Sequence, residues 1–329
     1  MRISVVIPVY NGSRYLHEAI VSVLKQRRPP DELVVYDDGS TDSSVDICQS
    51  FGNTIRVVRG EDGPSGFVNA WNKAIACATY DYISILHQDD YLYPDFLGSV
   101  ESALSIHSDV RHVFAVCDYV NEDSRTVLAF PCMPEQLVRY SSNAYAKAYQ
   151  QQYGSFPHIH RCPGVVTHRS IFEQDGCRYR SEAGHIADDD FFYRVGQFTD
   201  VVGILVPQAA YRHHATSATG KLDDLHLVRR LAEDYLFQVR EWRASSFLDS
   251  IDKKYFEFWA LRYLFKTIFG ALKSGNDMLF FDSSRDYASL MSEGLIHRHG
   301  KHVTRIRYLL ATEKVIGFSR LSTLIRRYA

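Results

Sequence analysis

The first hundred residues alternate between short apolar runs and longer amphipathic stretches. The apolar runs are rich in β-branched residues and predict buried strands at 3–9, 32–36, 55–58 and 82–86. The stretches between them repeat apolar residues every three or four positions and predict helices at 15–26, 43–51 and 67–78. This alternation favours an α/β fold with a parallel, doubly wound sheet. Ligands of such sheets bind beyond the carboxyl ends of the strands, so the residues that follow each strand matter most.

The pattern changes in the second half of the chain. Strand-like runs lie at 113–120 and 201–206, and 188–197 has the pattern of a short helix. Beyond residue 221 the chain consists of long amphipathic segments. We therefore expect an α/β domain over 1–220 and a C-terminal helical region over 221–329.

Composition excludes several classes of protein. A net charge of −2 over 329 residues argues against nucleic-acid binding. No apolar stretch is long enough to predict a membrane-spanning helix. The six cysteines form no CxxC pair, so we expect reduced thiols. The sequence opens on a strand-like run with no targeting segment before it, so the expected location is the cytoplasm.

A pair of carboxylates, Asp89 and Asp90, directly follows the predicted strand 82–86. Adjacent carboxylates repel each other unless a cation neutralises them, and rigidly held oxygen ligands suit Mg²⁺ or Mn²⁺. Such an ion can hold the phosphates of a nucleotide. The alternative is a helix cap, in which Asp90 or Asp95 accepts hydrogen bonds from free backbone amides.

Two more acidic clusters carry weaker signals. Asp38 ends the second strand, where its carboxylate could bind a nucleobase or ribose. The alternative is an acidic turn in which Asp42 caps the next helix. Asp188 begins a run of three aspartates and could take a proton from a bound hydroxyl. The alternative for this run is an acidic first turn favoured by the helix dipole.

The order and spacing of these motifs resemble the family 2 glycosyltransferases of the GT-A fold, over roughly residues 1–220. Residues 4–11 (Ser-Val-Val-Ile-Pro-Val-Tyr-Asn) are similar to the opening strand of that family, whose end wraps the nucleobase. The resemblance therefore implies nucleotide contacts from Pro8, Tyr10 and Asn11. In the second motif, residues 33–42, it implies that Asp38 reads the base.

The helix at 66–75 resembles the family's helix that faces the diphosphate, which implies donor contacts from Asn72 and Lys73. Many members carry an arginine at the position of Trp71, so we expect Lys73 to be the substitute cation.

The family's Asp-x-Asp-Asp motif matches His-Gln-Asp-Asp at 87–90. The match implies that Asp89 is the metal ligand, with Mn²⁺ or Mg²⁺ as the cation, and that Asp90 lies beside it at the donor. His87 stands where an aspartate usually faces the ribose.

Two further matches complete the predicted site. The Glu-Asp motif matches Ala187 and Asp188, so the glutamate is missing and Asp188 is the implied catalytic base. The Arg-x-His-x-x-Ser motif begins at Arg212. It implies a donor contact from Arg212 and a contact from His214 to the metal or diphosphate.

The resemblance implies inverting transfer of a sugar from a nucleotide diphosphate sugar to an unidentified acceptor, in the synthesis of glycans, glycolipids or glycoconjugates. Uridine is the commonest nucleotide in the family, and the acceptor classes are a sugar, a lipid-linked molecule or a small molecule. A nicotinamide dehydrogenase is disfavoured because no Gly-x-Gly-x-x-Gly turn follows the first strand. The alternative is a degenerate, non-catalytic member that only binds the nucleotide sugar.

The last thirty or so residues are basic, with apolar residues between the charges. Such helices could lie on an anionic membrane surface, on the inner face of the membrane. We favour the alternative, in which they form a helical cap or a homodimer interface. The basic residues are Arg298, Lys301, Arg305, Arg307, Lys314, Arg320, Arg326 and Arg327.

Overall fold

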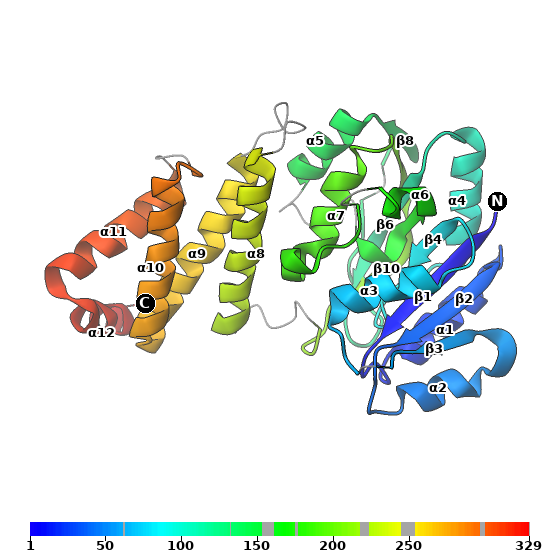
Figure 1. The fold of residues 1–329 in the computed structure, drawn as a ribbon, viewed down its shortest axis with the longest axis horizontal. Coiled ribbons are helices and arrows are strands. Elements are labelled where there is room, and N and C mark those ends of the chain that lie inside the picture. The colour runs from blue at the N-terminus through cyan, green and yellow to red at the C-terminus, as the bar shows by residue number, and fades with distance from the viewer. Residues whose placement is uncertain are drawn as a thin grey trace. The chain divides into compact units, whose positions relative to one another are not determined.

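The computed structural model describes residues 1–61, 63–131, 133–152, 161–174, 177–217, 224–244, 254–296 and 300–328. The chain divides into two compact units (Figure 1). The first comprises Met1–Ser181 and Ala187–His214, and the second Glu182–Ile186 and Ala215–Ala329. The predicted boundary near residue 220 falls at 218–223, outside the described residues, so the predicted domain limits stay a prediction.

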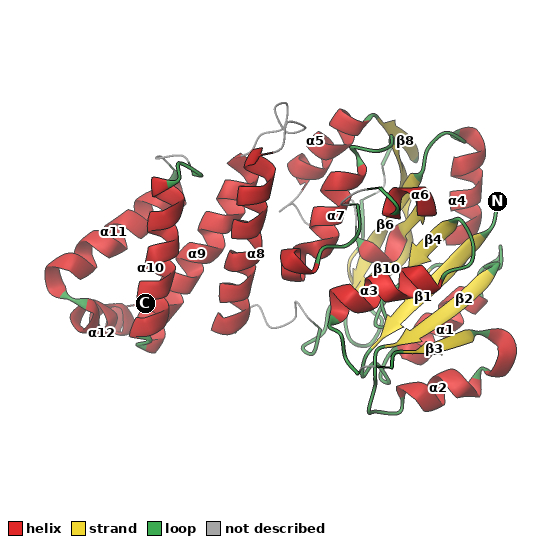
Figure 2. Ribbon diagram, in the orientation of Figure 1, coloured by secondary structure: helices red, strands yellow, loops and turns green. Residues whose placement is uncertain are grey.

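A single sheet, drawn in yellow in Figure 2, organises the first unit. Its strand order is β3-β2-β1-β4-β9-β6-β10-β5. Its strands are β1 (Ile3–Val9), β2 (Glu32–Asp37), β3 (Arg56–Arg59), β4 (Tyr82–Ile85), β5 (Tyr91–Leu92), β6 (His112–Val120), β7 (Thr126–Leu128), β8 (Leu137–Tyr140), β9 (Val165–His168) and β10 (Val201–Arg212). β1 pairs in parallel with β2 and β4, β2 with β3, and β6 with β10. The antiparallel strand β9 lies between β4 and β6. The predicted α/β fold with a mostly parallel sheet is confirmed.

Helices cover this sheet because their apolar residues recur at helical spacing. Every residue of β1 is buried, as expected for a central parallel strand with both faces covered. Helix α3 packs against β1 and β2, and α4 against β6 and β10. The helices of this unit are α1 (Leu16–Leu24), α2 (Ser44–Ser50), α3 (Phe67–Cys77), α4 (Phe96–Ile106), α5 (Ser142–Gln152), α6 (Arg169–Phe172) and α7 (Ala187–Val195), with short 3₁₀ turns at Gly52–Thr54 and Cys162–Gly164 and a third at Ser181–Ile186 that enters the second unit.

Strand β10 is longer than the predicted strand at 201–206 and reaches Arg212. Its pairing with β6 shifts register between Ile204 and Ala209, which lets the strand continue past Pro207. Its far half pairs antiparallel with β5, with Ala210 opposite Tyr91. Since β5 directly follows the acidic pair, this pairing brings the end of β10 beside that pair.

The second unit is helical, as predicted. Helix α9 contacts the other four long helices. The long helices are α8 (Leu225–Ala244), α9 (Lys254–Ser274), α10 (Asp277–Ser292), α11 (Lys301–Ile316) and α12 (Phe318–Tyr328). In the part of the chain that the structure describes, no helix combines the length and hydropathy needed to cross a membrane.

Candidate active site

The carboxyl ends of β1 and β2 are joined by side-chain hydrogen bonds to the backbone. Asn11 has a positive φ of 49°, a conformation that asparagine tolerates better than most residues. Its Oδ1 accepts a hydrogen bond from the Thr41 amide at 2.8 Å, and its own amide donates to Ser40 Oγ at 2.9 Å. Pro8 lies in β1, and the exposed Tyr10 donates its amide to Gln88 Oε1 at 2.9 Å. The three predicted nucleotide contacts therefore lie together at the end of β1.

Asp38, the predicted base reader, is buried at the same edge of the sheet. Its amide donates to the Val9 carbonyl at 2.8 Å. Its carboxylate accepts hydrogen bonds from both the amide and the hydroxyl of Ser65, each at 2.7 Å. Asp38 thus ties β1 and β2 to the loop before α3, and a nucleobase would have to use the remaining lone pairs of its carboxylate.

Both predicted donor residues on α3 have partners within the protein. The Asn72 side chain donates to the Tyr179 carbonyl at 2.7 Å and accepts from the Tyr179 amide at 3.2 Å. Lys73 lies beside the Tyr36 hydroxyl, where it opposes the rise in the pKa of Tyr36 that burial causes. The structure therefore gives Asn72 a role in fixing the segment before α7, and its predicted donor contact stays a prediction.

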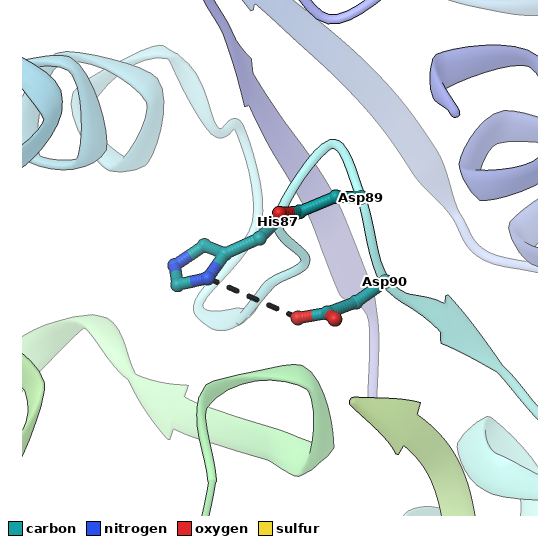
Figure 3. A group of neighbouring side chains, drawn as sticks. All are labelled: His87, Asp89 and Asp90. Atoms are coloured by element: carbon teal, nitrogen blue, oxygen red, sulfur yellow. Dashed lines mark ion pairs between the residues drawn. The ribbon is translucent and has the colours of Figure 1, made fainter. Parts of the chain in front are cut away.

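Three side chains from the loop after β4 form an acidic cluster: His87, Asp89 and Asp90 (Figure 3). One ligand atom from each lies within 4.8 Å of the others. Asp90 is buried, and its Oδ1 accepts a hydrogen bond from the Arg212 amide at 2.7 Å. Its Oδ2 is also buried and has no hydrogen-bond partner among the described residues; His87 Nδ1 is 3.9 Å away.

This cluster fits a divalent cation. Burial and the adjacent Asp89 raise the pKa of Asp90 well above its usual value. Burial also opposes ionisation of Asp89, but the hydrogen bond from His214 and the charges of both histidines outweigh it and lower the pKa of Asp89. A buried carboxylate oxygen without a partner, next to a second carboxylate, carries a desolvation cost that a bound cation offsets.

The cluster differs from the predicted ligand pair of Asp89 and His214. His87 and Asp90, which were predicted to face the donor, belong to it. His214 instead lies beside Asp89, with Nε2 2.9 Å from Asp89 Oδ2, and its ring is 4.9 Å from that of Tyr15. In this structure His214 therefore orients Asp89, and its predicted contact with the metal stays a prediction.

Arg212 is buried and its guanidinium is committed to the protein. Nε donates to the Asp89 carbonyl at 2.7 Å, and the other two nitrogens donate to Glu18 at 2.5 Å and to Ser124 at 2.9 Å. The guanidinium also lies 4.5 Å from the ring centre of Tyr15. A contact between Arg212 and the donor would have to replace some of these bonds, and the observed network makes Arg212 a support for the acidic loop.

The three aspartates of α7 have different surroundings. Asp190 is fully buried between Arg180 and Arg194, whose nitrogens lie 2.5 and 2.7 Å from its oxygens. Asp189 accepts a hydrogen bond from the Tyr149 hydroxyl. Asp188 is half-buried, and burial together with the charge of Asp189 raises its pKa to about 7. A pKa near 7 suits a general base at neutral pH.

Asp188 and the acidic cluster share one buried neighbour, the thiol of Cys162. Burial raises the pKa of Cys162 most, and the charges of Asp188, Asp90 and Asp89 raise it further. The charges of the candidate base and of the two candidate carboxylate ligands therefore act on one common buried thiol.

The structure also decides the alternatives based on helix caps. Asp95 precedes α4, but its side chain makes no cap hydrogen bond and pairs with Arg27 instead. Asp90 accepts the amide of Arg212 in strand β10 and not a helix amide, so that alternative is wrong for both residues. Asp42 does accept the Ser44 amide at 3.0 Å where α2 begins, as its alternative predicted.

One contact in the site has no signal in the sequence. The indole of Trp71 on α3 stacks on the imidazole of His87, with ring centres 4.6 Å apart and planes at 23°. No local pattern predicts this contact, because the two residues lie on separate elements that only the folded sheet brings together.

The mostly parallel sheet, with an acidic cluster beyond β4, defines an α/β protein of the GT-A type. Residues 4–174 match the model of "Glycosyl transferase family 2", and the chain belongs to this family. The family prediction is confirmed.

Several curated and solved proteins are similar to this chain. An uncharacterized glycosyltransferase of Rickettsia typhi is 35% identical over 141 residues, which cover 42% of this chain and 42% of that protein. The glycosyltransferase GlyG of Streptococcus pneumoniae is 42% identical over 101 residues, covering 30% of this chain and 33% of that protein. The chain thus matches less than half the length of either relative. The crystal structure of S. aureus TarS 1–349 has a TM-score of 0.61 at 16% identity and covers 99% of this chain and 90% of that one, which shows a shared fold.

Proposed function

We propose that the protein transfers a sugar from a UDP-linked donor to an acceptor hydroxyl, with inversion at the anomeric carbon. The observation that carries the proposal is the cluster of His87, Asp89 and Asp90, which fits a divalent cation that would hold a donor diphosphate. Asp188, half-buried in the first turn of α7, is the candidate base. Family membership supports sugar transfer. Crystal structures of TarS with UDP-GlcNAc and with UDP support a uridine nucleotide, at 14% and 16% identity.

In the proposed reaction, Asp188 accepts the proton of the acceptor hydroxyl as its oxygen attacks the anomeric carbon. The sugar–phosphate bond breaks, and UDP leaves with the bonding electrons. Asp89 would hold a divalent cation, either Mn²⁺ or Mg²⁺, whose positive charge would stabilise the leaving diphosphate. His214 and Arg212 hold Asp89 in place through its carboxylate and its carbonyl.

The stereochemical part of the proposal has its own test. With an α-linked UDP-sugar as the donor and an acceptor to which the protein transfers the sugar, the product should be β-linked, because a single displacement inverts the anomeric centre. Proton NMR of the product reads the linkage from the anomeric coupling constant. An α-linked product would rule out the single displacement.

We expect UDP binding to depend on a divalent cation and to weaken in Asp89→Asn, by about tenfold or more, since an amide is a poorer cation ligand than a carboxylate. Calorimetry of the full-length protein with UDP, in Mn²⁺ and in EDTA, measures both effects. Asp46→Asn, an exposed aspartate on α2, is the matched control and should bind UDP like the wild type. Equal UDP affinity in Mn²⁺ and in EDTA would contradict the predicted metal site.

The basic C-terminal helices give a separate prediction. Val303, Ile306 and Leu321 of α11 and α12 are buried, and both helices contact α9. Deleting residues 297–329 exposes the apolar side of α9, so we expect altered solubility, oligomeric state or membrane association with UDP affinity unchanged. Light scattering, vesicle flotation and calorimetry measure these properties. A folded truncation that no longer binds UDP would show that the tail contributes to the nucleotide site.

A further inference from the structure

The imidazole of His87 is held on one face by an aromatic wall. Trp71 stacks on it at 4.6 Å, and the indole is itself enclosed by the edges of Tyr179 and Phe67, each with ring centres 5.3 Å away. Trp71 is only 9% exposed. The imidazole of His87, stacked on Trp71, has few orientations open to it, so the directions of its two nitrogens are restricted.

Neither nitrogen of His87 makes a hydrogen bond with another residue that the structure describes. Nε2 is buried and has no hydrogen-bond partner in the described ranges. Nδ1 faces the unpartnered Oδ2 of Asp90 at 3.9 Å (Figure 3), which is too long for a hydrogen bond. Two atoms that bind one small divalent cation at about 2.1 Å each lie about 3.0–4.2 Å apart, depending on the angle between them. The 3.9 Å distance between His87 Nδ1 and Asp90 Oδ2 lies within this range, so one cation could bind both atoms.

We propose that His87 is a nitrogen ligand of the divalent cation, beside Asp89 and Asp90, and that Trp71 is the positioning residue that holds its ring. An imidazole ligand favours transition metals, whereas Mg²⁺ prefers oxygen ligands alone. The site therefore selects Mn²⁺ over Mg²⁺. This inference deepens the proposed function, and binding of the ion alone tests it independently of sugar transfer.

The direct test is pulsed electron paramagnetic resonance of Mn²⁺ bound to the full-length protein, with and without UDP. A directly bound imidazole nitrogen modulates the electron spin echo of Mn²⁺. We expect this modulation in the wild type, its loss in His87→Gln and its retention in His214→Gln. Two outcomes overturn the proposal: no nitrogen modulation in the wild type in either state, or a signal that survives in His87→Gln and disappears in His214→Gln.

Metal selectivity gives a second readout. His87→Asp replaces the nitrogen with an oxygen ligand, and the ratio of Mn²⁺ to Mg²⁺ affinity should fall by about tenfold or more, the usual scale for a change in a metal's ligand environment. Trp71→Leu should lower the same ratio and weaken the nitrogen modulation, while Trp71→Phe keeps an aromatic wall and should restore both. Equal weakening of Mn²⁺ and Mg²⁺ binding in Trp71→Leu would show that Trp71 is merely structural.

Failure of this inference can be told apart from failure of the proposed function. Nitrogen modulation in a protein that transfers no sugar would leave the ligand assignment standing and remove the function. Sugar transfer by a protein whose bound Mn²⁺ shows only oxygen ligands would leave the function standing and remove the ligand assignment.

Discussion

Replacing Asp188 by asparagine should lower the rate of sugar transfer by about two orders of magnitude or more, the usual scale for losing a general base. UDP affinity should stay nearly unchanged, because the amide keeps the shape of the side chain and the proposed donor contacts lie elsewhere. Burial and Asp189 hold the pKa of Asp188 at about 7, so its carboxylate can both lose and accept a proton near neutral pH. Single-turnover transfer rates and UDP calorimetry on the same variant separate the two effects.

Asp189→Asn is the matched control. Asp189 is the neighbouring carboxylate, and it already accepts the hydroxyl of Tyr149, so its replacement should cost far less transfer. If Asp189→Asn lost transfer while Asp188→Asn kept it, the base would be Asp189 and the assignment to Asp188 would be wrong.

The pH dependence of the wild type follows from the same residue. A general base works only when deprotonated, so the transfer rate should rise with pH through about 7 as Asp188 loses its proton. Rates between pH 5 and pH 9, roughly the range that spans such a transition, give the profile. A profile that is flat through neutral pH would contradict the assignment.

Replacing Asp190 by asparagine should mainly destabilise the fold. Asp190 is fully buried and pairs with both Arg180 and Arg194. Removing its charge leaves two guanidinium groups close together without the anion between them, and losing one partner of a buried pair costs on the order of 3 kcal/mol. Urea unfolding measures the loss. Asp81→Asn, an exposed aspartate, is the control, and equal unfolding midpoints for the two variants would contradict the structural role of Asp190.

The strands and helices of the first hundred residues could be predicted because their periodicity is local. The predicted strand at 3–9 is β1, and the other predicted strands there match β2, β3 and β4 within a residue or two. Strand β9 was not predicted, since its four residues carry no distinctive pattern and pair with β4 and β6 far along the chain. The full length of β10 was also missed, because Pro207 interrupts the strand pattern and only the pairing with β6 and β5 shows that the strand continues.

The site was predictable where consecutive residues carry the chemistry and unpredictable where the fold brings residues together. Asp89 and Asp90 were found from their place after a strand. The choice of Asp188 over Asp189 and Asp190 came from the family resemblance alone. The local pattern does not separate the three, because neighbours on a helix point about 100° apart and only tertiary packing gives each its surroundings. The stack of Trp71 on His87 and the network around Arg212 join separate elements, so no spacing rule reveals them.

Release of UDP from a panel of UDP-sugars is the most direct measurement of whether this protein is an enzyme or only binds nucleotide sugars. The full-length protein is incubated with each donor and Mn²⁺, with and without candidate acceptors, and free UDP is measured against time. The account predicts that at least one donor is turned over, that EDTA stops the release and that Asp188→Asn slows it by about a hundredfold or more. A wild-type protein that binds a UDP-sugar tightly but releases UDP no faster than Asp188→Asn would contradict it.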